Sequence, residues 1–251
     1  MSAVNFETHG GVATIELNRP ERLNAINAQL LEEFETALVQ ANADASVRII
    51  HLCASGRSFC AGDDLEELGD AELETNAIVS GIRRLQNISR LMMLGPKLVI
   101  CSVQGWAVGG GAAWPLNADI SIWSDDAKIR LPEATYGLFP SGGMTYLLPR
   151  ACGWQRSMDI MLLGEVLEAD DLVSLGIASE VFSQQAFSAA SELKIDQLLS
   201  LPSGSIERYK RNRGALIQEG LSQALDLEEK ELVEATTRLV RSRTTPSLVK
   251  S

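Results

Sequence analysis

The feature that most constrains the fold is a series of β-rich runs separated by segments with helical spacing. Residues 98–103 (LVICSV) form a nearly continuous apolar run, which is typical of a buried strand. Three further β-rich runs predict strands at residues 10–18, 47–54 and 119–123. Apolar residues at helical spacing predict helices at residues 27–42, 78–94, 158–163 and 167–175. Strands that alternate with helices indicate an α/β fold with covered sheets.

Chain length and hydrophobic content allow one large domain, or one domain with a small appendage. The chain has 251 residues, of which 45% are hydrophobic, so it can bury a sizeable core. The pattern becomes helix-dominated after residue 185. We therefore predict a core domain at 1–185 and a helical lid or oligomerisation segment at 186–251.

The charge balance limits the classes of partner. The net charge of −11 argues against nucleic acid and against anionic membranes as general partners. It does not exclude an anionic ligand, because a local cluster of cations or backbone N–H groups can still capture phosphates. The basic cluster at 208–213 is expected to be a solvated face.

Several features predict a cytoplasmic location. The first residues lack the pattern of a signal peptide, and no apolar stretch is long enough to span a bilayer. The four cysteines match no zinc pattern and are interpreted as free thiols. His51 lies inside a strand-like run and is expected to be structural.

Two glycine-bearing loops are the first candidates for chemistry. Residues 59–65 (FCAGDDL) and 104–111 (QGWAVGGG) each follow a β-rich run. Glycine lets the backbone approach a ligand, and the glycines at 109–111 also open a helix whose first N–H groups are unpaired. One N–H group from each loop could grip a developing oxyanion, and such a donor contributes roughly 3–4 kcal/mol to the transition state. The competing interpretation is a pair of tight turns. Neither a P-loop nor a dinucleotide-binding glycine pattern is present.

Glu133 is the third candidate, because it is the lone acid in a largely apolar stretch at 131–143. A carboxylate in such surroundings should have a raised pKa and could act as a general base. The competing interpretation is a carboxylate that caps a backbone group.

Together these segments resemble the crotonase (enoyl-CoA hydratase/isomerase) superfamily. The resemblance rests on LNRPERLNA at 17–25, FCAGDDL at 59–65 and GWAVGGG at 105–111. It also rests on Pro-Glu at 132–133, Gly-Leu at 137–138, Pro140 and Gly-Gly at 142–143. It implies a spiral of repeated β-β-α units with a helical C-terminal segment, and homotrimers or hexamers built as dimers of trimers. It also implies an acyl-CoA thioester substrate, with no metal and no cofactor beyond the coenzyme A of that substrate.

The resemblance also implies roles for individual residues. The oxyanion hole would use the backbone N–H groups of Asp63 and Gly110, and Glu133 would be the catalytic base. The expected coenzyme A contacts are Arg22, Leu23, Ala61, Asp64 and Leu65. The expected neighbours of the acyl group are Trp106, Ala113, Trp114 and Ser141.

One departure from the family pattern decides which reaction we favour. Hydratases of this family use two glutamates, and the first would fall at position 113, where this chain has Ala113. A lone base at Glu133 suits the migration of a double bond in a 3-enoyl-CoA. We therefore expect an isomerase-like enzyme. The alternatives are an enoyl-CoA hydratase, another acyl-CoA activity such as hydrolysis or decarboxylation, and an acyl-CoA-binding protein that has lost catalysis.

Overall fold

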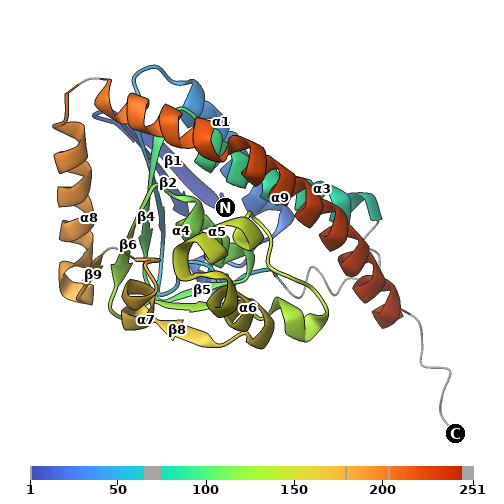
Figure 1. Ribbon diagram of the computed structural model, residues 1–251. Coiled ribbons are helices and arrows are strands. Elements are labelled where there is room, and N and C mark those ends of the chain that lie inside the picture. The colour runs from blue at the N-terminus through green and yellow to red at the C-terminus, as the bar shows by residue number, and fades with distance from the viewer. Residues whose placement is uncertain (1, 65–74, 179, 203, 245–251) are drawn as a thin grey trace, which may run out of the picture.

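The protein has two sheets surrounded by helices, with one long helix at the C-terminal end (Figure 1). The computed structural model describes residues 2–64, 75–178, 180–202 and 204–244. Strands and helices alternate along most of the described chain, as predicted.

The larger sheet has six strands in the order β1-β2-β3-β4-β6-β9. The first pair is antiparallel, and every following pair is parallel. Three of the predicted strands are confirmed within two residues at each end, and the apolar run at 98–103 is a strand along its whole length. The strands are β1 (Val4–His9), β2 (Val12–Leu17), β3 (Ile49–Ala54), β4 (Leu98–Val103), β6 (Ile120–Ser124) and β9 (Glu180–Phe182).

A smaller sheet joins three short strands in the order β5-β7-β8, namely β5 (Trp106–Val108), β7 (Lys128–Arg130) and β8 (Val166–Glu168). Strand β8 corrects one prediction. The helix expected at 167–175 begins only at Ala169, as α7 (Ala169–Ser174), because residues 166–168 pair with β7 in an antiparallel ladder. Pairing with a distant strand overrides the local helical spacing here.

The remaining elements surround the sheets. The helices are α1 (Ala28–Ala43), α3 (Thr75–Leu94), α4 (Gly110–Asn117), α5 (Met144–Cys152), α6 (Trp154–Leu163), α8 (Gln184–Leu199) and α9 (Ser205–Thr244), with 3-10 turns η1 (Pro20–Arg22) and η2 (Glu133–Tyr136). Asn27 sets the start of α1, because its side chain accepts a hydrogen bond from the N–H of Leu30 at 2.9 Å.

Helices cover both faces of the larger sheet, which explains why β4 is buried along its whole length and is apolar except at Ser102. On one face, Ile100 belongs to a cluster that includes Ile195 of α8. On the other face, Val99 and Cys101 belong to the main core, together with Phe34 of α1. Figure 1 shows α8 along one side of this sheet and α9 lying across the molecule beside α3. A strand buried on both faces lacks the alternation of apolar and polar residues, and the hydroxyl of Ser102 is hydrogen-bonded to His51 and Ser191.

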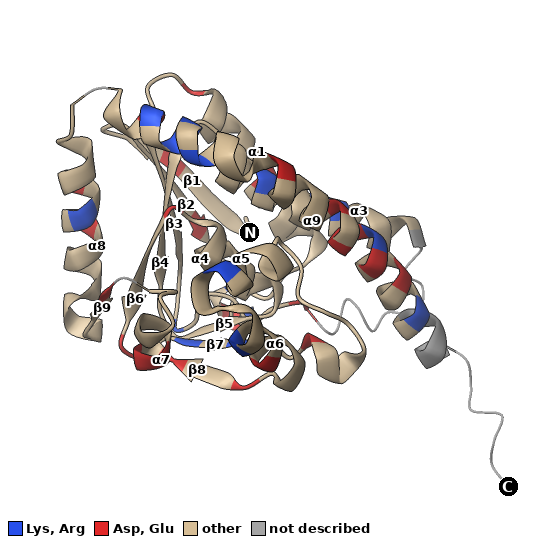
Figure 2. Cartoon of the chain, in the orientation of Figure 1, with Lys and Arg blue, Asp and Glu red and all other residues tan. Residues whose placement is uncertain are grey.

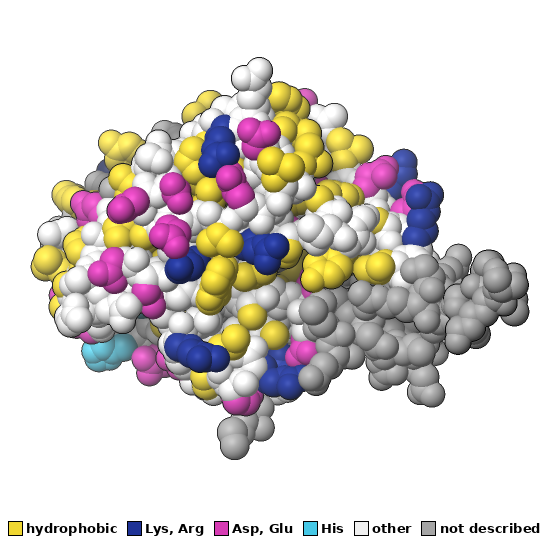
Figure 3. Space-filling view, turned by 90° about the horizontal axis from the view of Figure 1, so that it is seen from below, with side chains coloured by type: hydrophobic (Ala, Val, Ile, Leu, Met, Phe, Trp, Pro, Cys, Tyr) yellow, Lys and Arg dark blue, Asp and Glu magenta, His cyan; other side chains and the backbone are white. Residues whose placement is uncertain are grey.

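Charged side chains are spread over the surface with both signs interspersed (Figure 2). Seen from below, apolar side chains lie among basic and acidic ones (Figure 3).

The expectation of a solvated basic face at 208–213 is wrong for Lys210. This side chain is buried, and its Nζ atom donates hydrogen bonds to the Met92 carbonyl at 2.6 Å and to Asp119 at 2.7 Å. In the described part of the chain, no helix has the length and apolarity to cross a membrane. The proposed division at residue 185 falls in the first turn of α8, which begins at Gln184, and it stays a prediction.

Candidate active site

The candidate site is a cavity of about 490 Å³. Its walls come from the start of α1, residues 61–64, α3, residues 106–110, residues 130–141 and the last turns of α9. Both glycine-bearing loops and Glu133 therefore lie at one cavity. Helix α9 belongs to the segment expected to be a helical lid or oligomerisation segment, but the residues with which it lines the cavity were not predicted. Its wall residues Leu232, Thr236 and Leu239 are spaced by four and three positions, which is a helical stripe that sequence inspection could have found.

Backbone hydrogen bonds hold the two loops side by side. The N–H of Cys60 donates to the Trp106 carbonyl at 2.9 Å, and the N–H of Val108 donates to the Cys60 carbonyl at 2.9 Å. The two loops lie so close together that only glycine fits at positions 62 and 111. A Cβ atom at Gly62 would lie 3.0 Å from the Val108 oxygen, and one at Gly111 would lie 2.5 Å from the Cys60 sulfur. The fixed spacing of the loops follows from these close contacts.

Two backbone N–H groups at this junction have no acceptor within the described residues. Ile26 pairs with the loop on either side of Asp63, by donating to the Gly62 carbonyl and accepting from the Asp64 N–H, both at 2.8 Å. This pairing leaves the Asp63 N–H unused. Gly110 is the first residue of α4, where N–H groups lack intrahelical partners. Both residues line the cavity, so the pair can serve as donors to an oxyanion.

Glu133 lies in η2 at the wall of the same cavity. Its Oε1 atom is 3.1 Å from the position that a Cβ atom would take at Gly109. Its Oε2 atom is buried and has no hydrogen-bond partner among the described residues. Burial raises the pKa of Glu133 to about 7, and the negative charge of Asp63 adds to this shift. A carboxylate with these properties is suited to accept a proton near neutral pH.

Asp63 brings a second carboxyl group to the cavity. Its side chain is accessible from the cavity, yet the surrounding protein raises its pKa to about 6 by desolvation. The sequence interpretation used only the backbone N–H of this residue. A role for the Asp63 side chain was not predicted, because the family resemblance implies a role only for the backbone of this residue.

Four of the expected coenzyme A contacts gather at one edge of the cavity. The Ala61 N–H donates to the Leu23 carbonyl at 3.0 Å, and the Arg22 side chain lies 3.7 Å from that of Asp64. Arg19 also pairs with Asp64, at 3.1 Å. Ala61 and Asp64 line the cavity itself. Leu65 lies outside the described residues. The coenzyme A contacts stay a prediction.

The four expected neighbours of the acyl group divide into two pairs. Trp106 and Ser141 line the cavity. Ala113 and Trp114 are buried and are not part of its wall. Trp114 packs edge-on against Phe34, with ring centroids 5.0 Å apart, which is a core contact. The structure therefore gives no support for an acyl contact at Ala113 or Trp114.

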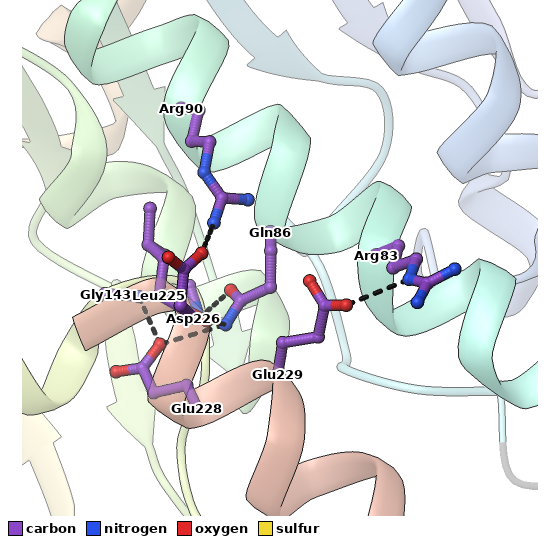
Figure 4. Close-up of polar contacts among 9 residues, drawn as sticks. Arg83, Gln86, Arg90, Gly143, Leu225, Asp226, Glu228 and Glu229 are labelled. Atoms are coloured by element: carbon purple, nitrogen blue, oxygen red, sulfur yellow. Dashed lines mark hydrogen bonds and ion pairs between the residues drawn. The ribbon is translucent and has the colours of Figure 1, made fainter. Parts of the chain in front are cut away.

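The turn that carries Ser141 is fixed from three helices. The Gly142 N–H donates to Gln86 Oε1 of α3 at 2.9 Å, and Asn117 of α4 donates to the Gly142 carbonyl at 2.8 Å. The Gly143 N–H donates to Glu228 of α9 at 2.8 Å, and Gln86 also donates to Glu228 at 3.2 Å (Figure 4). Because α9 also lines the cavity, these hydrogen bonds connect the part of the cavity wall formed by α9 to the turn that carries Ser141.

The cysteines and His51 lie outside the chemistry of the site. All four cysteines are free thiols, as predicted. Burial raises the pKa of Cys53 and of Cys60 to about 12, which leaves both thiols unreactive. His51 bonds to Ser102 at 2.8 Å, and burial lowers its pKa to about 4, so its role is structural as expected.

Comparison with known proteins decides the family. The family model described as enoyl-CoA hydratase/isomerase matches residues 7–244. The chain belongs to this family. It is 34% identical over 221 residues to a 1,2-epoxyphenylacetyl-CoA isomerase of Escherichia coli (strain K12), covering 87% of this chain and 84% of that protein. It is 32% identical over 226 residues to a 4-chlorobenzoyl coenzyme A dehalogenase-2 of Arthrobacter sp, covering 89% and 80%.

Solved structures agree on the fold. An enoyl-CoA hydratase from Mycobacterium avium subsp. paratuberculosis K-10 superposes with a TM-score of 0.87 at 25% identity, covering 98% of this chain and 99% of that one. An enoyl-CoA hydratase from Bacillus halodurans gives a TM-score of 0.89 at 24% identity, covering 96% and 98%. The predicted crotonase fold with a helical C-terminal segment is therefore confirmed. As a member of this family, the chain is an acyl-CoA enzyme.

Proposed function

We propose that this enzyme moves the double bond of a 3-enoyl-CoA into conjugation with the thioester. Glu133 takes the proton from C2, and the N–H groups of Asp63 and Gly110 bind the oxygen of the resulting dienolate. A proton returned at C4 completes the shift. The proposal calls on no metal and on no cofactor other than the coenzyme A of the substrate.

The observation that carries the proposal is the state of Glu133. Its Oε2 atom is buried without a partner at the cavity, and its pKa is raised to about 7. The capping interpretation is disfavoured, because burial raises the pKa of this carboxyl by more than the hydrogen bond from its own backbone lowers it. A group whose pKa lies near neutrality is an efficient proton acceptor and donor at that pH.

The composition of the cavity wall supports an acyl thioester as the ligand. Apolar side chains such as Leu85, Phe139 and Leu232 line the cavity, beside the two unpaired N–H groups of Asp63 and Gly110. An apolar cavity with a few convergent polar groups is typical of a small-molecule site. The N–H pair would hold the thioester oxygen while the acyl group contacts the apolar wall.

A hydratase is the main alternative, because several relatives carry that name. The residue at position 113 counts against it. Ala113 has no ionisable group and is buried outside the cavity wall. Water would then have to be activated by a carboxyl group other than the one that the family places there.

The test offers the purified enzyme a trans-2-enoyl-CoA and a 3-enoyl-CoA and follows the products. We expect conjugated product from the 3-enoyl-CoA, and a loss of about 10²-fold or more in kcat for Glu133→Gln. Binding of a saturated acyl-CoA, measured by calorimetry, should persist in that variant. Efficient hydration of the 2-enoyl-CoA without double-bond migration would overturn the isomerase proposal. Binding without any turnover would instead favour an acyl-CoA-binding protein.

We also propose that the enzyme assembles as a homotrimer or a dimer of trimers, as the resemblance implies. Exposed apolar side chains on α6 support a contact between copies, among them Trp154, Leu162 and Leu163. Light scattering after gel filtration measures the mass in solution, and a monomer at micromolar concentration would contradict this proposal.

A further inference from the structure

The cavity contains two carboxyl groups that form no ion pair and no hydrogen bond to another side chain among the described residues. Four charged residues of the described chain line it. Asp64 pairs with Arg19 at 3.1 Å and with Arg22 at 3.7 Å. Arg130 donates from Nε to the Gly164 carbonyl at 3.0 Å. Asp63 and Glu133 are the two that remain.

These two carboxyl groups influence each other. The charge of Asp63 contributes to raising the pKa of Glu133 to about 7, while desolvation raises that of Asp63 to about 6. Two like charges at one cavity resist being ionised together, so the pair titrates as a unit. Between these values the pair holds about one proton, which lies mainly on Glu133 because its pKa is the higher. The form with Asp63 protonated and Glu133 ionised is the minor one, and it is the form that can act as acid and base at once.

The position of Asp63 also fits a second role. Its backbone N–H is one of the two unpaired donors, so its side chain originates beside the expected thioester oxygen. The family position for a second carboxylate, residue 113, is occupied by an alanine outside the cavity wall. Among the described carboxyl groups of the wall, Asp63 is the one besides Glu133 that forms no ion pair, so it can take over the second proton transfer.

We propose that the Asp63 side chain is a second catalytic residue, which delivers a proton to C4 of the substrate after Glu133 has removed one from C2. The assignment rests on the proposed isomerisation. In the first step the C2–H bond breaks, Glu133 gains the proton, and the electron pair delocalises into the dienolate. In the second step the dienolate forms a C4–H bond with the proton of Asp63. Transfer of one proton from Glu133 to Asp63, directly or through solvent, restores the starting state.

The test compares wild type with Asp63→Asn, which keeps the backbone N–H and removes the acid. We expect kcat for double-bond migration to fall about 10²-fold or more, with the affinity for a saturated acyl-CoA unchanged. The wild-type pH–rate profile should be bell-shaped with limbs near pH 6 and 7. The variant should lose the bell and keep a single limb that rises with pH, because only Glu133 must then be ionised. Asp196→Asn, an exposed change on α8 outside the cavity, is the matched control.

Two further measurements keep the outcome decisive. Asp63→Glu retains a carboxyl group and should restore a bell-shaped profile. The second measurement uses a substrate deuterated at C2 and follows how much deuterium appears at C4 of the product. In Asp63→Asn, Glu133 must return to C4 the deuteron that it took from C2, so this variant should transfer more label than wild type. An active wild type whose Asp63→Asn variant has the same kcat, profile and label transfer would overturn this assignment alone. A wild type without isomerase activity would overturn the proposed function and the assignment with it.

Discussion

Glu228 accepts a hydrogen bond from the backbone N–H of Gly143 at 2.8 Å, across 85 residues of sequence. The same carboxylate accepts from the N–H of Thr145 at 3.1 Å and from its hydroxyl at 2.5 Å, so it caps the start of α5. Burial raises the pKa of Glu228, and these hydrogen bonds oppose the shift. One side chain of α9 thus holds the turn that carries Ser141 to the cavity.

Removing this carboxylate should destabilise the fold. We expect Glu228→Ala to lower the free energy of unfolding by about 2–4 kcal/mol, because two buried N–H groups lose their acceptor. Glu229→Ala removes the neighbouring ion pair with the exposed Arg83, also visible in Figure 4, and should cost less than about 1 kcal/mol. Urea unfolding of both variants measures the difference. Equal losses would show that Glu228 is no more than a surface contact.

A second prediction concerns Gly109, whose φ of +54° is strained for any other residue. A Cβ atom there would lie 3.1 Å from Glu133 Oε1 and would push the carboxylate away from its position. We expect Gly109→Ala to lower kcat by about 10- to 100-fold with little change in acyl-CoA affinity. Gly10→Ala is the matched control, since Gly10 has a φ of +57° and no atom within 4 Å of the added methyl group. If Gly10→Ala lowered kcat equally, a loss of folded enzyme would explain the result.

The parts of the site that could be predicted from sequence are those that depend on short-range chemistry. The glycines near 62 and 110 mark a close backbone approach wherever they occur, and a lone glutamate in an apolar stretch predicts its own raised pKa. The strand at 98–103 could be predicted for the same reason, because burial on both faces leaves a nearly continuous apolar run.

The remaining features depend on which distant segments meet. Strand β8 exists only because β7 pairs with it, and three residues are too few for a strand pattern. The charged side chain of Lys210 is buried only because Asp119 lies beside it. Trp114 was expected near the acyl group, yet its helix turns it toward Phe34. In each case the residue that decides the structure is distant in sequence, so a pattern within a short stretch of sequence does not reveal it.

A third prediction uses the pH dependence of stability. The pKa of Glu133 rises from an ordinary 4.5 to about 7 on folding, so the folded state holds this proton more tightly than the unfolded state does. Its ionisation therefore costs stability, and the cost grows as the pH rises from about 4.5 to about 7 and is then constant. Glu133→Gln removes the charge, so its advantage over wild type should be absent at pH 4 and reach about 1–3 kcal/mol at pH 8.

Denaturant unfolding of wild type and Glu133→Gln at a series of pH values measures this advantage. Glu231→Gln, an exposed change on α9, controls for the general effect of losing one negative charge. A difference between wild type and Glu133→Gln that did not vary with pH would mean that the Glu133 carboxyl is solvated like any surface group.

The last prediction concerns the position that separates this chain from the two-glutamate pattern. A simple view would expect Ala113→Glu to create a hydratase. The structure argues otherwise, because Ala113 is 1% exposed and Gly142 stands against it. A Cβ atom at Gly142 would lie only 2.8 Å from that of Ala113, and Gly142 is held in place by Gln86 and Asn117.

We therefore expect Ala113→Glu to gain no hydration of a 2-enoyl-CoA. It should also lower the free energy of unfolding by about 3 kcal/mol or more, since it forces volume and a carboxyl group into a packed region. The smaller Ala113→Asp should show the same direction with a lesser loss. Both variants are assayed for hydration and isomerisation after their folded fraction has been measured by circular dichroism. Hydration gained by either folded variant would show that a carboxyl group at 113 reaches the substrate, and that a single substitution separates the two reactions in this chain.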